Sequence, residues 1–236
     1  PFDRDLGDGE QVVAWLFTAP GASTDAPAPL LVYCHGNAEI IDHQDDEVSR
    51  YRRMGFAVLL PEYRGYGRSG GRPSQPAIRE DVLHFIDAAR ARGDIADERL
   101  VYNGRSLGSA VAVAAAAHRS PRAIILTSPF TSVVAMANKM FMPGLIVRNK
   151  YRTDHVLPTL DVPVLIFHGV RDEIIPVSHP RRLAKLARDA TLVEYDCAHN
   201  DFPGRAYDDY WSRIAAFVEP IAAQTPPRTN DDPTAN

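Results

Sequence analysis

The sequence contains few of the residues that usually hold small secreted domains or metal sites together. Only two of its 236 residues are cysteines, Cys34 and Cys197. Two cysteines cannot form a disulfide framework, and this low number is compatible with a reducing compartment. The eight histidines show neither HxxH nor HExxH spacing, and isolated cysteines provide no zinc site. We therefore expect no metal, and no motif implies an organic cofactor.

A strong charge and long apolar runs are also lacking. The formal net charge is −4 and the arginines are scattered, so no basic stripe indicates nucleic acid or an anionic membrane surface as a partner. No apolar run approaches the roughly 18 residues of a transmembrane segment, and no signal-like segment begins the chain. We expect a cytoplasmic protein. Because the chain starts at Pro1 rather than at methionine, we also expect a trimmed N-terminus, with removal of a signal or anchor as the alternative; nothing indicates the oligomeric state.

The sequence does contain a regular alternation of strand-like and helix-like segments. With 45% hydrophobic and 24% charged residues, positions 1–223 fit one globular domain, and the polar, proline-rich residues 224–236 are expected to be a disordered tail. After a frayed polar start, apolar runs predict strands at 11–18, 30–34, 57–61, 100–102, 123–127, 163–167 and 192–195. Helical spacing predicts helices at 42–54, 76–92, 107–117 and 178–188, and a last helix with its inner face at Tyr207, Tyr210, Trp211, Ile214, Phe217, Val218 and Ile221. The alternation favours an α/β fold with a mostly parallel central sheet and helices on both faces.

The stretch from Leu100 to Ala117 carries the clearest chemical motif. A short apolar strand turns, within about two residues of Ser106, into an alanine-rich helix, with Gly104 and Gly108 on either side. Such a nucleophile elbow holds the serine hydroxyl clear of the sheet and directs the positive end of the helix at a developing oxyanion. An ordinary strand-to-helix connection that happens to contain a serine is the alternative.

A second G-x-S-x-G sequence surrounds Ser69, but its context differs. The polar segment YRGY precedes it, and Arg72 and Pro73 follow. Neither a strand nor an apolar helix can therefore flank this serine closely. We interpret Ser69 as a loop residue.

Serine needs a base before it can act as a nucleophile, and His199 is the best candidate. In a parallel sheet, functional side chains gather at the carboxyl ends of the strands, and His199 follows the predicted strand that ends at Tyr195. His35 and His168 end strands and precede glycines, so we interpret both as structural supports for their loops. The remaining histidines lie in predicted helices or in polar segments.

An acid that orients this histidine is expected after the preceding strand. Asp172 lies there and is favoured, although spacing alone does not exclude its neighbour Glu173. The order Ser106, Asp172, His199 is the nucleophile, acid, histidine order of one hydrolase architecture.

An oxyanion hole needs two backbone N–H groups. Leu107, next to the nucleophile, can provide one, and Asn37 in the loop HGNA after a predicted strand can provide the other, because Gly36 lets the backbone turn. An ordinary loop is the alternative interpretation of HGNA.

Taken together, these motifs resemble the α/β-hydrolase superfamily. The segments HGNAE, PEYRGYGRSGG, NGRSLGSA, TSPFTSV, FHGVRDEIIP and HND are similar to those of Bem46 proteins and ABHD-type serine hydrolases, over about residues 11–220. The resemblance implies a sheet of the eight-stranded type, a Ser/Asp/His triad at Ser106, Asp172 and His199, oxyanion donors at Asn37 and Leu107, and hydrolysis of esters or thioesters. Two features depart from the family pattern: residues 196–198 replace the frequent glycines before the histidine, and no cysteine-rich N-terminus indicates a membrane-anchored depalmitoylase.

We therefore expect a serine hydrolase that cleaves small-molecule carboxylic esters through an acyl-enzyme. An acyl-thioesterase or peptidase with the same triad is the alternative among enzymes, and a non-catalytic binding domain is the alternative of another class. The excursion 128–161, where the resemblance places a cap, is expected to line the substrate pocket with Phe130, Met136, Met140 and Phe141. Packing of this face on the sheet is the alternative. A cap this short favours short to medium acyl chains.

Overall fold

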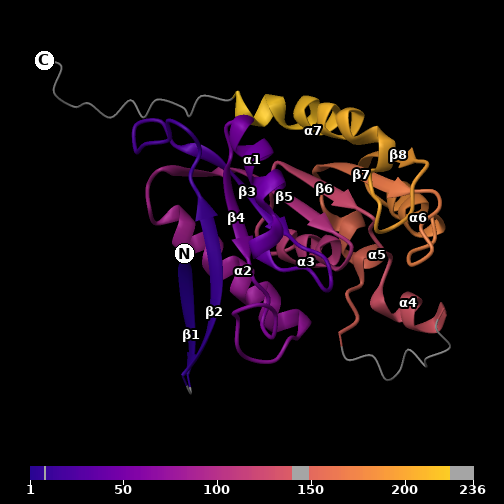
Figure 1. The fold of residues 1–236 in the computed structure, drawn as a ribbon, viewed down its shortest axis with the longest axis horizontal. Coiled ribbons are helices and arrows are strands. Elements are labelled where there is room, and N and C mark those ends of the chain that lie inside the picture. Colours follow the sequence, from indigo (N-terminus) through magenta and orange to yellow (C-terminus); the bar gives the residue numbers. More distant parts are fainter. Residues whose placement is uncertain (8, 140–148, 224–236) are drawn as a thin grey trace, which may run out of the picture.

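The central element of the chain is an eight-stranded sheet (Figure 1). A computed structural model describes residues 1–7, 9–139 and 149–223. The strands lie in the order β1-β2-β4-β3-β5-β6-β7-β8. They are β1 (Phe2–Gly7), β2 (Glu10–Phe17), β3 (Ala28–Cys34), β4 (Ala57–Pro61), β5 (Ile95–Arg105), β6 (Ala123–Thr127), β7 (Pro163–Gly169) and β8 (Asp189–Tyr195). Strand β2 pairs antiparallel with both β1 and β4, and the other neighbours are parallel, which confirms the expected mostly parallel α/β sheet.

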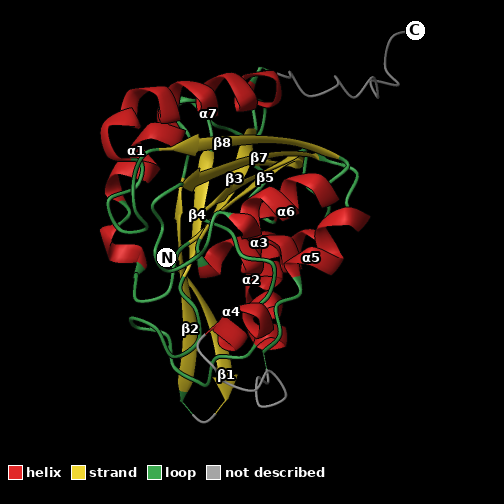
Figure 2. Cartoon of the chain, turned by 90° about the vertical axis from the view of Figure 1, so that its right-hand side faces the viewer, coloured by secondary structure: helices red, strands yellow, loops and turns green. Residues whose placement is uncertain are grey.

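Helices cover both faces of this sheet (Figure 2). On one face, α1 (Asp45–Arg53) and α7 (Tyr207–Ala222) bury Tyr51, Trp211 and Ile214 against the strands. On the other face lie α2 (Gln75–Arg90), α3 (Leu107–Ala116) and α6 (Ser178–Leu186), which share a second apolar cluster with the sheet. The right-handed crossovers of parallel strands require this arrangement, because each connecting helix must return across a face of the sheet.

The expected frayed start is wrong, because residues 2–7 form the edge strand β1. Phe2 and Leu6 are half-buried on one side of the strand and pack against an apolar cluster. Arg4, on the same side, donates from Nη1 to Asp81 Oδ1 of α2 at 2.6 Å. A charged residue at an inward position hides the alternation of a strand in the sequence, and antiparallel pairing with β2 stabilises it nonetheless.

Two further boundaries differ from the sequence-based expectation. Strand β5 begins at Ile95 instead of Leu100, because Ile95 and Ala96 already pair with β3, ahead of an irregularity in the pairing at the polar residues 97–99. In α7, Tyr207 is exposed, whereas Tyr210 and Trp211 are buried as expected. An apolar run therefore predicts too short a range for a strand that also contains polar residues. An aromatic residue near the start of a helix need not face the core.

The turn between β5 and α3 is packed too tightly for side chains at its two glycines. A Cβ atom on Gly108 would overlap the carbonyl groups of Cys34 and His35 at the end of β3. A Cβ atom on Gly104 would overlap the backbone of Gly108. These two glycines therefore let the start of α3 lie directly against β3.

The connection from β6 to β7 carries α4 (Val133–Lys139) and α5 (Thr153–Val156). The expected pocket residues Met140 and Phe141 and the expected tail 224–236 lie outside the described residues.

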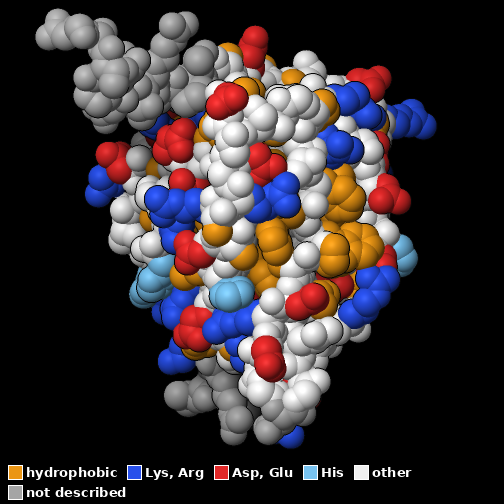
Figure 3. Space-filling view, turned by 90° about the vertical axis from the view of Figure 1, so that its left-hand side faces the viewer, with side chains coloured by type: hydrophobic (Ala, Val, Ile, Leu, Met, Phe, Trp, Pro, Cys, Tyr) orange, Lys and Arg blue, Asp and Glu red, His pale blue; other side chains and the backbone are white. Residues whose placement is uncertain are grey.

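Among the helices that the structure describes, none is both long and apolar enough to cross a membrane. Figure 3 shows the face at the β1–β2 edge of the sheet, where positive and negative side chains are interspersed around apolar patches.

Replacing Gly108 with alanine should destabilise the fold, because the added methyl group has no space beside β3. Overpacking of this kind costs about 1–3 kcal/mol of the free energy of unfolding, and we expect a value at the upper end. Urea unfolding monitored by circular dichroism measures it. Ala117→Gly, at the exposed C-terminal end of the same helix, should cost at most about 1 kcal/mol, from helix propensity. A Gly108→Ala midpoint equal to that of the wild type would contradict the packing described above.

Candidate active site

Ser106 lies at the turn between β5 and α3, where a strand, a sharp turn and a helix were expected. Its φ of 51° and ψ of −115° place a non-glycine residue in a strained conformation. The Ser106 N–H donates to the Thr127 carbonyl of β6 at 2.8 Å, which fixes the turn to the sheet. The serine therefore stands at the carboxyl edge of the central strands, beside the N-terminus of α3.

Asp172 and His199 meet at the same edge of the sheet. They follow β7 and β8, and only 8% of Asp172 and 5% of His199 is exposed. His199 Nδ1 lies 2.6 Å from Asp172 Oδ2, and Asp172 Oδ1 accepts the N–H groups of Ile174 at 2.9 Å and Ile175 at 2.7 Å. The alternative acid, Glu173, is exposed. The structure thus brings Asp172 into contact with the histidine.

The Asp172 carboxylate fixes the protonation pattern of this pair. Burial by itself raises the pKa of Asp172, but the hydrogen bonds from His199 and the Ile175 N–H outweigh it, so the pKa lies below its usual value. A charged carboxylate can only accept, and His199 Nδ1 must therefore carry the hydrogen. With the hydrogen on Nδ1, the lone pair that a general base requires lies on Nε2.

Arg105 connects the Ser106 turn to the His199 loop. Its Nη2 donates to the His199 carbonyl at 3.2 Å. Among the described residues, Ser106 Oγ makes no hydrogen bond to His199. The structure therefore places Ser106 at the end of β5 on the same edge of the sheet, separated from β7 by β6, and the two loops are joined through Arg105 and not through the serine hydroxyl. Catalytic hydrogen bonds are often long in the absence of substrate.

In the loop after β3, the Gly36 N–H donates to a side chain of the same loop, whereas the Asn37 N–H does not. The Gly36 N–H donates to Glu39 Oε2 at 2.8 Å. Within the described part of the chain, the N–H groups of Asn37 and Leu107 meet no acceptor. Tyr66 Oη donates to Asn37 Oδ1 at 2.6 Å and so holds the Asn37 side chain. Both donors expected for an oxyanion are therefore available to a ligand.

The second G-x-S-x-G motif forms a structural turn, which confirms the interpretation of Ser69 as a loop residue. Ser69 is buried, and its Oγ accepts the Val13 N–H and donates to the Glu62 carbonyl, both at 3.1 Å. The Ser69 N–H donates to the Tyr66 carbonyl at 2.8 Å. This turn therefore presents Tyr66 to Asn37.

The sequence interpretation missed Glu39, Tyr66 and Arg105 as parts of this site. Their signal was present, because Glu39 and Arg105 are charged residues of opposite sign that lie close to the two expected oxyanion donors along the chain. Spacing along the sequence does not show that they meet in the fold.

The two histidines interpreted as supports are fully buried in the loops beside the site. His35 Nε2 lies 2.9 Å from Glu62 Oε1. His168 Nε2 donates to the Ile175 carbonyl at 2.9 Å and so closes the loop that carries Asp172. Burial lowers the pKa of His168, and the attraction of Asp172, whose Oδ2 is 3.7 Å away, opposes this only in part.

Cys197 precedes His199 by two residues and is fully buried. Burial raises the pKa of its thiol to about 11, and burial also raises the pKa of Cys34 to about 12. Both thiols therefore stay protonated near neutral pH and act as small apolar side chains.

A cavity of about 230 Å³ lies next to Leu107. Its lining is mostly apolar and consists of Tyr66, Pro73, Ser74, Ile78, Leu107, Val133, Asn149 and Tyr151. Of the residues expected in a substrate pocket, Phe130 is buried in the core and Met136 packs against the same apolar cluster, and neither lines this cavity. Three lining residues, Val133, Asn149 and Tyr151, belong to the excursion 128–161 that was expected to form the cap.

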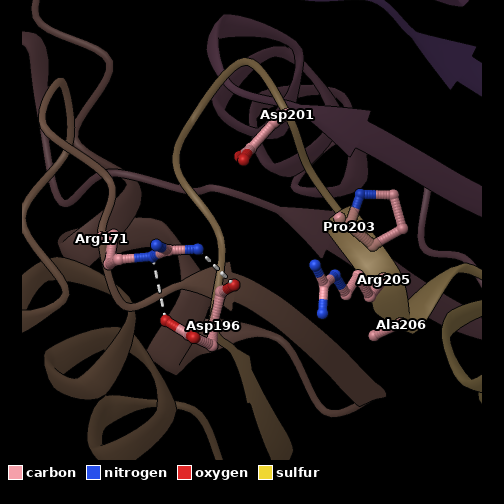
Figure 4. Close-up of a pocket in the computed structure, with 7 residues that line it drawn as sticks. Arg171, Asp196, Asp201, Pro203, Arg205 and Ala206 are labelled. Atoms are coloured by element: carbon pink, nitrogen blue, oxygen red, sulfur yellow. Dashed lines mark hydrogen bonds and ion pairs between the residues drawn. The ribbon is translucent and has the colours of Figure 1, made fainter.

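A second cavity, of about 590 Å³, opens between the loops that follow β7 and β8 (Figure 4). Arg171 forms an ion pair with Asp196 at 2.9 Å on one side of it, and Arg205 lines the other side. None of Ser106, Asp172 and His199 lines this cavity. The charged side chains that line this cavity are of both signs and are largely exposed, so they do not indicate one class of ligand. Within the described ranges, no cluster of three or more His, Cys, Asp or Glu side chains is arranged to hold a metal ion.

Comparison with known proteins identifies the family. The model of the family described as "Serine aminopeptidase, S33" matches residues 25–158, which is more than half of the chain. The chain belongs to this α/β-hydrolase family. Relatives of the hydrolase include the "Alpha/beta hydrolase domain-containing protein WAV2" of Arabidopsis thaliana, 30% identical over 92% of this chain and 77% of that protein. "Protein bem46" of Schizosaccharomyces pombe is 30% identical over 84% of this chain and 70% of that protein.

Solved structures of other hydrolases share the fold. Est1E from Butyrivibrio proteoclasticus aligns with a TM-score of 0.74 at 19% identity, over 94% of this chain and 99% of that chain. A monoacylglycerol lipase from Paleococcus ferrophilus aligns with a TM-score of 0.71 at 17% identity, over 89% of this chain and 99% of that chain. The expected α/β-hydrolase fold is thus confirmed.

The burial of His168 predicts a loss of stability in mild acid. Because the pKa of His168 is lower in the folded chain than in the unfolded chain, its contribution is complete above the ordinary histidine value of about 6.5 and is lost as the pH falls below it. We expect the thermal midpoint to fall between about pH 7 and pH 5, and to fall less in His168→Gln, which keeps a donor for the Ile175 carbonyl. His118→Gln, at an exposed site, should behave like the wild type. Equal pH dependence in all three proteins would refute the assignment.

Proposed function

We propose that this α/β hydrolase is a serine hydrolase that cleaves carboxylic esters through an acyl-enzyme intermediate. The observation that carries the proposal is the buried pair of His199 Nδ1 and Asp172 Oδ2, 2.6 Å apart, at the sheet edge where the strained turn holds Ser106. Strain at a non-glycine residue and a buried charged pair are both typical of catalytic sites.

In this proposal, Ser106 Oγ forms a bond to the acyl carbon while its proton passes to His199 Nε2. The alcohol leaves with that proton, and a water molecule then repeats the sequence, releases the acid and restores Ser106. Asp172 holds the imidazole in the required tautomer. The N–H groups of Asn37 and Leu107 stabilise the oxyanion, and loss of one such donor typically costs about 3–4 kcal/mol of the activation barrier.

We assign the acyl chain to the cavity beside Leu107, because that residue provides an oxyanion donor and a part of the wall. The cavity volume of about 230 Å³ is below the range of roughly 300–1,000 Å³ of pockets for drug-sized ligands. This size supports short to medium acyl chains. Phe130 and Met136 belong to the apolar cluster that also contains Ile78 and Tyr151, so they would support the pocket wall from behind.

Thioesters and amides use the same acyl chemistry, and the description of the matched family as a serine aminopeptidase favours including amides in a substrate screen. We therefore propose to compare p-nitrophenyl esters, acyl-CoA thioesters and aminoacyl p-nitroanilides. A non-catalytic binding domain would turn over none of them.

Labelling with a fluorophosphonate probe tests the nucleophile. Ser106→Ala should abolish covalent labelling and ester turnover. Ser69→Ala should be labelled at the wild-type rate, although loss of its hydroxyl leaves the buried Val13 N–H without an acceptor and should cost about 1–3 kcal/mol of stability. Labelling that survives in Ser106→Ala but is lost in Ser69→Ala would overturn the assignment, and an unlabelled wild type would favour a binding domain.

A chain-length series tests the pocket. Val133→Phe fills part of the cavity and should lower kcat/KM for octanoyl esters about 10- to 200-fold more than for acetyl esters, since pocket changes of this size are worth roughly 1–3 kcal/mol. Val134→Phe, on the same helix but outside the cavity lining, is the matched control. If both variants keep the wild-type chain-length profile, the acyl chain binds elsewhere.

A further inference from the structure

We propose that Arg105 and Glu39 act as positioning residues, which hold the Asn37 loop and the His199 loop in fixed positions on the two sides of Ser106. The proposal rests on the proposed function, because it concerns the same site. Neither side chain is assigned a contact with the substrate. Both act through the groups that they hold.

Glu39 fixes the loop after β3 through both of its carboxylate oxygens. Oε2 accepts the Gly36 N–H at 2.8 Å, and Oε1 forms an ion pair with Arg105 Nη1. A Cβ atom on Gly36 would lie 2.9 Å from Glu39 Oε1, so the carboxylate packs directly against the Gly36 backbone. Because Glu39 occupies the Gly36 N–H, the next N–H along the loop, that of Asn37, remains for the oxyanion.

Arg105 extends this connection to the other side of the nucleophile. It is the last residue of β5, directly before Ser106, and its second guanidinium nitrogen donates to the His199 carbonyl at 3.2 Å. A guanidinium can bind two acceptors at fixed angles, whereas an ammonium group is a single flexible point charge. The residue before the nucleophile thus links the loop that provides an oxyanion donor to the loop that provides the base.

The ion pair of Arg105 and Glu39 is partly buried, and it can therefore restrain these loops. The side chains of Arg105 and Glu39 are 26% and 21% exposed, so solvent screens their attraction less than it screens a fully exposed pair. Displacement of a catalytic group by about 1 Å can cost roughly 100-fold in rate. Loss of the connection should therefore slow the reaction of bound ester and leave the acyl pocket unchanged.

The test compares Arg105→Gln, Arg105→Lys, Glu39→Gln and the Arg105→Gln/Glu39→Gln double variant in the full chain. With p-nitrophenyl acetate, we expect kcat to fall about 10- to 100-fold in Arg105→Gln and in Glu39→Gln, with KM nearly unchanged. Arg105→Lys should retain more activity. The double variant should be no slower than Arg105→Gln, because residues that act as one unit are not additive.

Arg119→Gln is the matched control. Arg119 is 28% exposed and pairs with Asp87 and Asp97, away from the Ser106 turn. Its removal should change stability at most modestly and should leave kcat at the wild-type value. A thermal melt of every variant shows that the rates are measured on folded protein. If Arg105→Gln does not fold, Glu39→Gln carries the test, because its amide oxygen can still accept the Gly36 N–H.

Two outcomes would overturn the proposal. Wild-type kcat in folded Arg105→Gln or folded Glu39→Gln would show that the pair is only structural, and additive losses in the double variant would show that the two residues act separately. Failure of the proposed function has a different signature, since the wild type itself would then show neither fluorophosphonate labelling nor turnover.

Discussion

The close contact between the start of α3 and the end of β3 sets the geometry of the whole candidate site. Gly108 lies against the carbonyl groups of Cys34 and His35 with no room for a side chain. Strand β3 continues into the turn that carries Asn37, and α3 begins at Leu107. One steric constraint therefore fixes the Ser106 turn, the positive end of a helix and the Asn37 loop relative to one another.

Three carboxylates around the site repeat one arrangement. Each binds a backbone N–H of a loop and also a basic side chain: Asp172 binds Ile174, Ile175 and His199, Glu39 binds Gly36 and Arg105, and Glu62 binds Ile41 and His35. A loop N–H that would otherwise need water thus gains a charged acceptor. Loops at the carboxyl edge of the sheet can thus be rigid although they form no regular secondary structure.

The sequence predicted those features that depend on local patterns of residue type, such as apolar strands. Apolar runs marked most of the buried strands, and because parallel strands end at one edge, Ser106, Asp172 and His199 were expected at the edge where the structure places them. It was less informative where position depends on a distant partner. β1 was missed because Arg4 points inward to Asp81, and the Arg105 to Glu39 pair was missed because it joins two loops far apart in the chain. Phe130 and Met136 are apolar residues of the expected cap, but the sequence does not show that Phe130 is buried in the core and that Met136 packs against it.

The buried thiol of Cys197 has a consequence for how the protein tolerates oxidants. Because burial raises the pKa of this thiol to about 11, the thiol stays almost entirely protonated near pH 7. Peroxide and alkylating reagents attack the thiolate, so they find almost no target beside His199. The nucleophile proposed above is a hydroxyl, so the chemistry assigned to this site does not depend on the redox state of the neighbouring thiol.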